Sequence, residues 1–197
     1  MRNFQLGFVA FFFIFTACCQ DSSNSTLGLS NELVTPIDLS SYLSNRTDLS
    51  KKVDSVFNAM SPESRVAQLI MPAAGRLGHS EEHIKFLIDH NYIGGILLLN
   101  GTKEQFTDWV IEYNMRAKKM GQLPFLFSAD AEPSLVNRKI IGSTLVKKAN
   151  EVNSEEEVIE LAALISNDLN AIGINYNFSP VVDLSANKTV GYRGFGT

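Results

Sequence analysis

The chain has 197 residues, of which 45% are hydrophobic, and its formal net charge is −4 at pH 7. This length and apolar content suit a globular unit with a real hydrophobic core, and they exclude a disordered or strongly charged protein. The mild acidity also argues against a nucleic-acid partner, because nucleic-acid-binding proteins usually present a basic face.

The N-terminus has the composition of an export signal. Arg2 precedes an apolar run from Leu6 to Ala17, and a short basic segment followed by about a dozen apolar residues is typical of a signal peptide. The run is too short for a good membrane span, which needs about 20 apolar residues. The polar residues 20–47, rich in serine and asparagine, then predict a flexible tether.

Both cysteines of the chain, Cys18 and Cys19, lie where this apolar run ends. The stretch FTAC resembles a bacterial lipobox, in which a small residue precedes the cysteine that is lipidated, although Phe15 stands where leucine is usual. We therefore predict a lipoprotein signal peptide over 1–19, lipidation of Cys18, and an exported, membrane-anchored protein in the periplasm or at the outer membrane. The alternatives are an ordinary signal peptide with incidental cysteines, or a signal anchor.

From about Asp48 onward, helical and strand patterns alternate along the chain. Ser61 with Pro62 predicts a helix start, and the pairs Thr102/Gln105 and Ser154/Glu157 predict capping boxes. The expected helices cover 49–60, 61–70, 80–90, 102–119 and 154–173, and the expected strands cover 68–73, 93–99, 123–130 and 174–184.

Apolar strands separated by amphipathic helices indicate parallel β/α units with both faces of the sheet covered. Either a doubly wound sheet or a (β/α)8 barrel satisfies this pattern, and in both folds the chemistry lies at the carboxyl ends of the strands. Polar residues gather there: Asp130 and Glu132 follow one predicted strand, Asp183 and Asn187 follow another, and Arg193 comes soon after. No Gly-rich phosphate fingerprint follows a strand, which argues against a nucleotide-binding domain.

Chain length bears on the choice between these folds. A barrel needs about 200 to 250 residues at least, whereas roughly 150 residues follow the predicted tether. The sequence therefore predicts either a small open sheet or part of a barrel, and we favour a chain that carries the N-terminal half of a TIM-type (β/α)8 barrel, over residues 48–197.

Four stretches occur in order: IGGILLL at 93–99, LPFLFSADAEPSLVNR at 123–138, GINYNFSPVVDLSAN at 173–187 and VGYRGFG at 190–196. Together they resemble the N-terminal domain of glycoside hydrolase family 3, whose motifs read IGGxILF, PLxxAxDxEGGxVxR, GINxNFAPVVDVxxN and IGxRSFG. The resemblance runs from about Ser61 to Thr197 and looks closest to the β-N-acetylglucosaminidases. The sequence departs from the family at Pro133–Ser134, where the family has two glycines, and at Gly194, where it has serine.

The resemblance implies a retaining glycosidase that removes terminal β-linked N-acetylglucosamine from peptidoglycan or chitin fragments. It implies that Asp130, Arg138 and Arg193 bind the terminal sugar, with the carboxylate accepting hydrogen bonds from hydroxyl groups and the arginines donating charge-assisted ones. We expect Glu132 and Asp183 to support their loops, Glu132 by pairing with Arg138 or otherwise. The simpler alternatives are a strand-end turn for Asp130 and a surface position for Arg138.

The same resemblance puts the catalytic nucleophile, an aspartate that forms a glycosyl-enzyme, on a strand beyond residue 197. The acid/base also lies later: a histidine–aspartate pair in the N-acetylglucosaminidases, a glutamate of a second domain in the β-glucosidases. No catalytic residue is therefore assigned in this chain. We expect an oligosaccharide substrate, a membrane reached through the lipid, and no cofactor or metal, because the histidines His79, His83 and His90 lack a third ligand. A β-glucosidase of the same family and a non-catalytic sugar-binding lipoprotein are the alternatives.

Overall fold

The computed structural model describes residues 47–183 and 190–194. Thr47–Thr197 form one compact unit. The predicted signal peptide, the predicted lipidation site Cys18 and nearly all of the predicted tether lie outside the described residues. Within the described ranges, no helix is long and apolar enough to cross a membrane.

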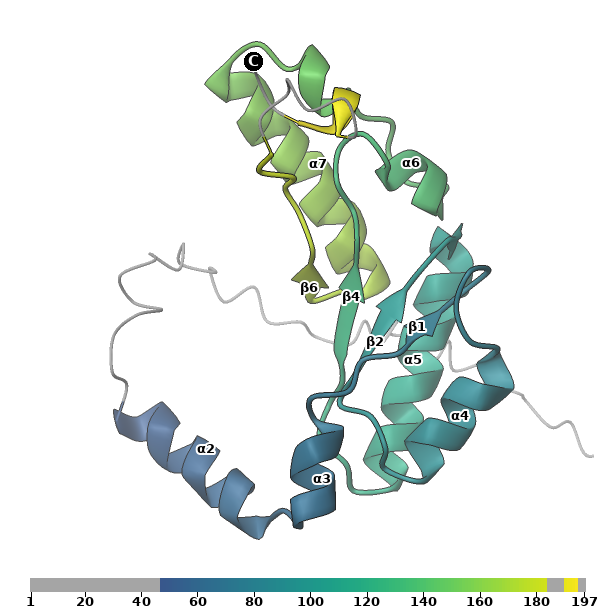
Figure 1. Cartoon of the computed structure of the whole chain (residues 1–197), viewed down its shortest axis with the longest axis vertical. Coiled ribbons are helices and arrows are strands. Elements are labelled where there is room, and N and C mark those ends of the chain that lie inside the picture. The colour runs from purple at the N-terminus through teal and green to yellow at the C-terminus, as the bar shows by residue number, and fades with distance from the viewer. Residues whose placement is uncertain (1–46, 184–189, 195–197) are drawn as a thin grey trace, which may run out of the picture. The chain divides into compact units, whose positions relative to one another are not determined.

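Four short parallel strands form the central sheet, in the order β1-β2-β4-β6. They are β1 (Ala73–Ala74), β2 (Gly95–Leu98), β4 (Leu126–Ala129) and β6 (Tyr176–Asn177). Each strand pairs with the next one of this sheet along the chain, through crossovers that contain helices (Figure 1). The prediction of an α/β fold with a parallel sheet is confirmed. The sheet is open, with β1 and β6 at its edges, and the described strands do not close into a barrel.

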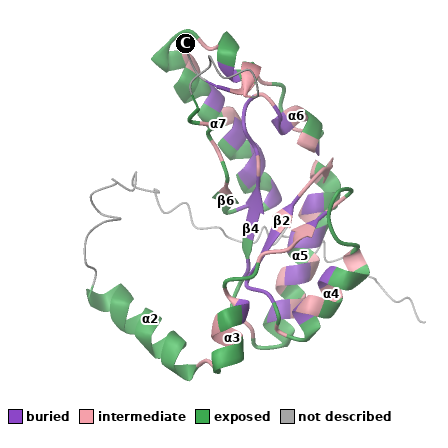
Figure 2. Ribbon diagram, in the orientation of Figure 1, coloured by how far each residue is buried: buried purple, intermediate pink, exposed green. Residues whose placement is uncertain are grey.

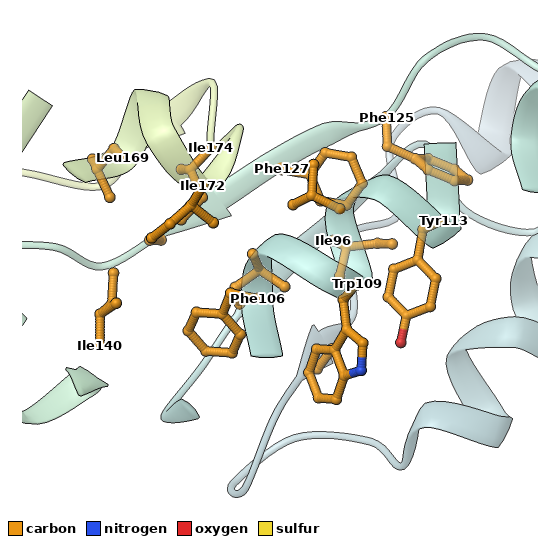
Figure 3. Packing of buried hydrophobic residues seen from close by; sticks show 14 of the residues in the cluster. Ile96, Phe106, Trp109, Tyr113, Phe125, Phe127, Ile140, Leu169, Ile172 and Ile174 are labelled. Atoms are coloured by element: carbon orange, nitrogen blue, oxygen red, sulfur yellow. The ribbon is translucent and has the colours of Figure 1, made fainter. Parts of the chain in front are cut away.

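Three amphipathic helices pack on this sheet. They are α4 (Glu81–Asp89), α5 (Lys103–Lys119) and α7 (Glu155–Ile172). Helix α5 contacts both of the others. Figure 3 shows how Phe106, Trp109 and Tyr113 of α5 lie among buried side chains of the sheet. The strand residues in this cluster alternate along β2 and β4, as expected for one face of a sheet: Ile96, Leu98, Phe127 and Ala129.

The opposite face of the sheet is less covered. Leu97 of β2 is half-buried, and Leu126 of β4 is 51% exposed. Between them, the buried Ser128 hydroxyl donates a hydrogen bond to Met71 Sδ at 3.0 Å. The described helices therefore cover one face of the sheet, whereas the sequence pattern led us to expect both faces to be covered.

Predicted caps fix the helix starts. The side chains of Ser61, Thr102 and Ser154 accept hydrogen bonds from the backbone N–H three residues on, at 3.1, 3.0 and 3.3 Å. Helix α7 ends at Gly173, whose φ of +91° is a left-handed cap that favours glycine. A Cβ at Gly173 would also lie 2.8 Å from a Val110 methyl group. This cap turns the chain from α7 directly into β6.

The two N-terminal helices are α2 (Thr47–Ala59) and α3 (Pro62–Ala67). Helix α2 forms where it was predicted, but none of its residues is buried (Figure 2). It contacts α3 through Arg65, whose Nε donates to the Phe57 carbonyl at 3.0 Å. The Arg65 guanidinium carbon also lies 4.0 Å from the centroid of the Phe57 ring, a cation–π contact.

The structure differs from the predicted elements in three places. The strand expected over 68–73 is regular only at Ala73–Ala74, although the carbonyls of Ile70 and Pro72 already accept hydrogen bonds from the β2 segment. The strand expected over 174–184 is regular only at Tyr176–Asn177, and Pro180 lacks the N–H that would continue a ladder. Elements that were not predicted are a parallel strand pair and three short helical turns: β3 (Gly101–Thr102), β5 (Ile140–Ile141), α6 (Val136–Lys139), η1 (Ala149–Glu151) and η2 (Gly191–Arg193).

Candidate functional site

The loop after β4 begins at the carboxyl end of the sheet and is fastened by asparagines that flank or lie in β6. Asn175 Oδ1 accepts from the Phe127 N–H, and Asn177 Oδ1 accepts from the Ala131 N–H, both at 3.0 Å. These side chains extend the β4–β6 pairing beyond the backbone ladder. The start of the loop, which carries Asp130 and Glu132, therefore has a fixed position.

Glu132 lies in the interior, with no exposed surface, and pairs with Arg193. Arg193 Nε donates to Glu132 Oε1 at 2.5 Å, and Nη2 donates to Oε2 at 3.1 Å. This bidentate contact raises the pKa of Arg193 above its ordinary value, and the nearby Asp130 charge raises it further. The sequence suggested Arg138 as a partner of Glu132, but the structure gives that contact to Arg193, which is 61 residues away in the chain.

Asp130 has a different partner, and its side chain is about one-third exposed. Its Oδ2 accepts a hydrogen bond from the Nζ atom of Lys139, whose side chain is 15% exposed. Lys139 was not among the residues singled out in the sequence. A lysine nine residues after the aspartate gives no periodic signal across a loop, so only the one-turn helix α6 reveals the contact.

Arg138 precedes Lys139 on α6 but does not join this pair. Its side chain is exposed and lines a cavity at the ends of β1 and β2. Asp183 is also exposed and lies at the last described position before 184–189. The structure therefore brings Asp130, Glu132 and Arg193 together, whereas Arg138 lines a separate cavity.

Ser134, which stands where the family has glycine, makes two hydrogen bonds that join three segments. Its hydroxyl donates to the Tyr192 carbonyl at 2.9 Å and accepts from the Ala149 N–H at 3.0 Å. The loop after β4 is thereby tied to η1 and to η2, the turn that carries Arg193. This departure from the family pattern thus adds contacts that hold the Glu132–Arg193 geometry.

Metal chemistry has no support in the described residues. No group of three or more histidine, cysteine, aspartate or glutamate side chains among them is arranged to hold a metal ion. His79 and His83 lie with ring centroids 4.7 Å apart, on the loop before α4 and on α4 itself, and no third ligand joins them there.

The chain belongs to glycoside hydrolase family 3, because residues 62–197 match the glycosyl hydrolase family 3 N terminal domain. This match shows the family that the sequence motifs had indicated. The chain matches no curated protein.

The chain is also similar to solved structures. A glycoside hydrolase family 3 β-N-acetylglucosaminidase from Paenibacillus sp. str. FPU-7 superposes with a TM-score of 0.62 at 28% identity, covering 70% of this chain and 28% of that chain. A β-glucoside phosphorylase bound to 2FGlc superposes with a TM-score of 0.64 at 16% identity. The match covers 78% of this chain and 28% of that chain. A fungal multi-domain family 3 β-N-acetylglucosaminidase superposes with a TM-score of 0.55 at 24% identity. That match covers 64% of this chain and 16% of the fungal chain. This chain therefore spans little more than a quarter of the first two.

The Glu132–Arg193 pair generates a stability prediction. Arg193→Ala should lower the free energy of unfolding by roughly 1–3 kcal/mol, because it leaves a buried carboxylate without its donors. Urea unfolding of the purified protein measures this. The matched control is Arg116→Ala, which removes a surface pair with Asp89 and should cost at most about 1 kcal/mol. Equal, small losses in both variants would contradict a structural role for the buried pair.

Proposed function

We propose that this chain contributes the sugar-binding part of a retaining β-N-acetylglucosaminidase that acts on peptidoglycan or chitin fragments. The observation that carries the proposal is the arrangement at the end of β4: a partly exposed carboxylate, Asp130, beside an arginine held by Glu132. The family membership and the Paenibacillus enzyme at 28% identity support the choice of sugar.

The chemistry of this arrangement suits a neutral ring rich in hydroxyl groups. Asp130 Oδ2 is bonded to Lys139, so Oδ1 is left to accept from a sugar hydroxyl. Arg193 uses Nε and Nη2 for Glu132, and no hydrogen bond within the described residues uses Nη1. Charged acceptors and donors held in place form stronger hydrogen bonds than neutral groups do, and they lose little entropy on binding.

The reaction itself belongs, in this proposal, to a longer protein. We assign the nucleophile and the acid/base to residues outside 1–197, as the family resemblance implies. Asp130 and Glu132 are not assigned those roles. Glu132 is buried and bonded through both oxygens, so it is not free to attack a sugar or to exchange protons with one.

We further propose that the described sheet is part of a (β/α)8 barrel. The support is physical: the described helices cover one face, and the other face presents Leu97, which is half-buried, and Leu126, which is exposed. A barrel buries its inner face against its own strands. An apolar cavity of about 580 Å³ between α7 and β6, beside the open edge, also fits a position where further β/α units pack.

The proposed function is tested by comparing two chromogenic substrates. The protein expressed at its full length should hydrolyse a nitrophenyl N-acetylglucosaminide with a higher kcat/KM than the matching glucoside. The reverse preference would favour a β-glucosidase of the same family. Binding of the sugar without any turnover would favour a non-catalytic sugar-binding protein.

Asp130→Ala should lower kcat/KM for the N-acetylglucosaminide at least tenfold, because it removes charge-assisted hydrogen bonds worth roughly 1.5–3 kcal/mol each. The control is Lys139→Met, which removes the ammonium group but keeps the carboxylate. If Asp130 only shapes its loop, both variants will lower the melting temperature by similar amounts and leave kcat/KM unchanged. Kinetics and melting curves must therefore be measured on the same preparation.

We also propose that the protein is exported and lipid-anchored through Cys18, because this cysteine follows the apolar segment and a small residue. Cys18→Ala should abolish incorporation of labelled palmitate in bacterial cells, whereas Cys19→Ala should not. Continued labelling of the Cys18→Ala protein would contradict this assignment.

A further inference from the structure

The segment between β5 and α7, residues 142–154, lies against η2, the turn that carries Arg193. It includes η1, whose residues contact those of η2. Arg193 is one of the proposed sugar ligands. The contacts of this segment therefore bear on where the Arg193 side chain can lie.

The start of the segment is fastened to the scaffold. Asn137 of α6 donates from Nδ2 to the Thr144 carbonyl at 2.6 Å and accepts at Oδ1 from the Val146 N–H at 3.1 Å. The Thr144 N–H donates to Asp168 Oδ2 at 2.5 Å, and Asp168 Oδ1 accepts from Lys103 Nζ at 2.5 Å. Asp168 is a buried residue of α7, and Lys103 begins α5. The segment is thus bonded to two of the helices that pack on the sheet.

The segment reaches η2 through one hydroxyl group and one ammonium group. The Ser134 hydroxyl accepts from the Ala149 N–H of η1 and donates to the Tyr192 carbonyl of η2, at 3.0 and 2.9 Å. Lys148 Nζ lies 5.4 Å from the centroid of the Tyr192 ring, a cation–π contact. Because the same hydroxyl group bonds both turns, its removal would break the hydrogen-bonded link between η1 and η2.

Turn η2 depends on such outside contacts. It is three residues long, and a short 3₁₀ turn has poorer hydrogen-bond geometry than an α-helix. Its own backbone contributes the bond from the Arg193 N–H to the Val190 carbonyl, at 3.1 Å. Ser134 bonds the backbone one residue before Arg193, whereas Glu132 bonds the guanidinium group itself. The backbone beside Arg193 and the tip of its side chain are therefore fixed separately, by two residues of the loop after β4.

We propose that Ser134 is a positioning residue for Arg193, and that its hydroxyl sets the place from which the guanidinium group donates to the terminal sugar. The inference rests on the proposed function, since a sugar contact of Arg193 is part of that function. A donor whose position is fixed before binding loses less entropy when the sugar binds. The serine is a feature of this chain, because the family has glycine at this position and glycine offers no hydroxyl group.

The experiment measures KM and kcat of the full-length protein with the nitrophenyl N-acetylglucosaminide. Ser134→Ala removes the hydroxyl group but leaves Arg193 and Glu132 in place. It should raise KM about fivefold and change kcat by less than about twofold, because a contact made equally with the bound substrate and the transition state acts on KM. Ser134→Thr keeps a hydroxyl group and should return KM to within about twofold of the wild-type value.

Ser61→Ala is the control, because it also removes a serine hydroxyl that accepts a backbone hydrogen bond, from the Ser64 N–H at 3.1 Å at the start of α3. It should lower the melting temperature, since the loss of a helix cap is destabilising, and leave KM as in the wild type. If Ser134→Ala likewise lowers the melting temperature and leaves KM unchanged, the serine only supports its loop and the positioning role is wrong. A raised KM that Ser134→Thr does not restore would also contradict that role.

Urea unfolding tests the same contact without a substrate, so its outcome does not depend on the proposed function. The cycle compares Ser134→Ala, Arg193→Ala and the double variant, with Arg193→Lys in place of Arg193→Ala if the latter does not fold. The double variant should lose less free energy of unfolding than the sum of the two single losses, because the two residues hold the same turn. Additive losses would contradict the coupling whether or not the protein is active. Coupling in a protein that cleaves neither chromogenic substrate would support the positioning of Arg193 and contradict only the proposed function.

Discussion

The contact on which the candidate site depends is the ion pair between Glu132 and Arg193. Glu132 has no exposed surface, and a carboxylate without a donor is costly to bury. The loop after β4 therefore requires the turn that carries Arg193, and that turn is further held by the Ser134 hydroxyl. The pair is better regarded as a means of fixing loop geometry than as a net source of stability, because desolvation offsets much of its attraction.

The carboxyl end of the sheet is organised around this constraint. Asp130 and Glu132 are two residues apart but differ in their surroundings. Asp130 is partly exposed and bonded to Lys139, whereas Glu132 is buried and bonded to Arg193. A similar division occurs on α6, where Arg138 and Lys139 are neighbours in sequence, but Lys139 contacts Asp130 and Arg138 lines a separate cavity. Short segments after the strands thus place neighbouring side chains in different surroundings, which is how β/α folds combine a constant scaffold with variable chemistry.

The sequence predicted the elements whose signals are local. Capped amphipathic helices such as α5 and α7, and apolar strands such as β2 and β4, occur where the patterns indicated them, because helix caps and side-chain periodicity act over a few residues. Helix α6 and the β3–β5 pair were missed, since two-residue strands and a one-turn helix have no such pattern. The partners of Glu132 and Asp130 were missed for a different reason: they are set by tertiary contacts, across 61 and nine residues.

The central claim is that a sugar binds at the end of β4. A crystal structure of the full-length protein with N-acetylglucosamine tests it most directly. We predict a sugar hydroxyl within about 2.6–3.0 Å of an Asp130 carboxylate oxygen, with Arg193 still bonded to Glu132. A sugar bound elsewhere, for example in the apolar cavity between α7 and β6, with Asp130 bonded to Lys139 alone, would contradict the claim.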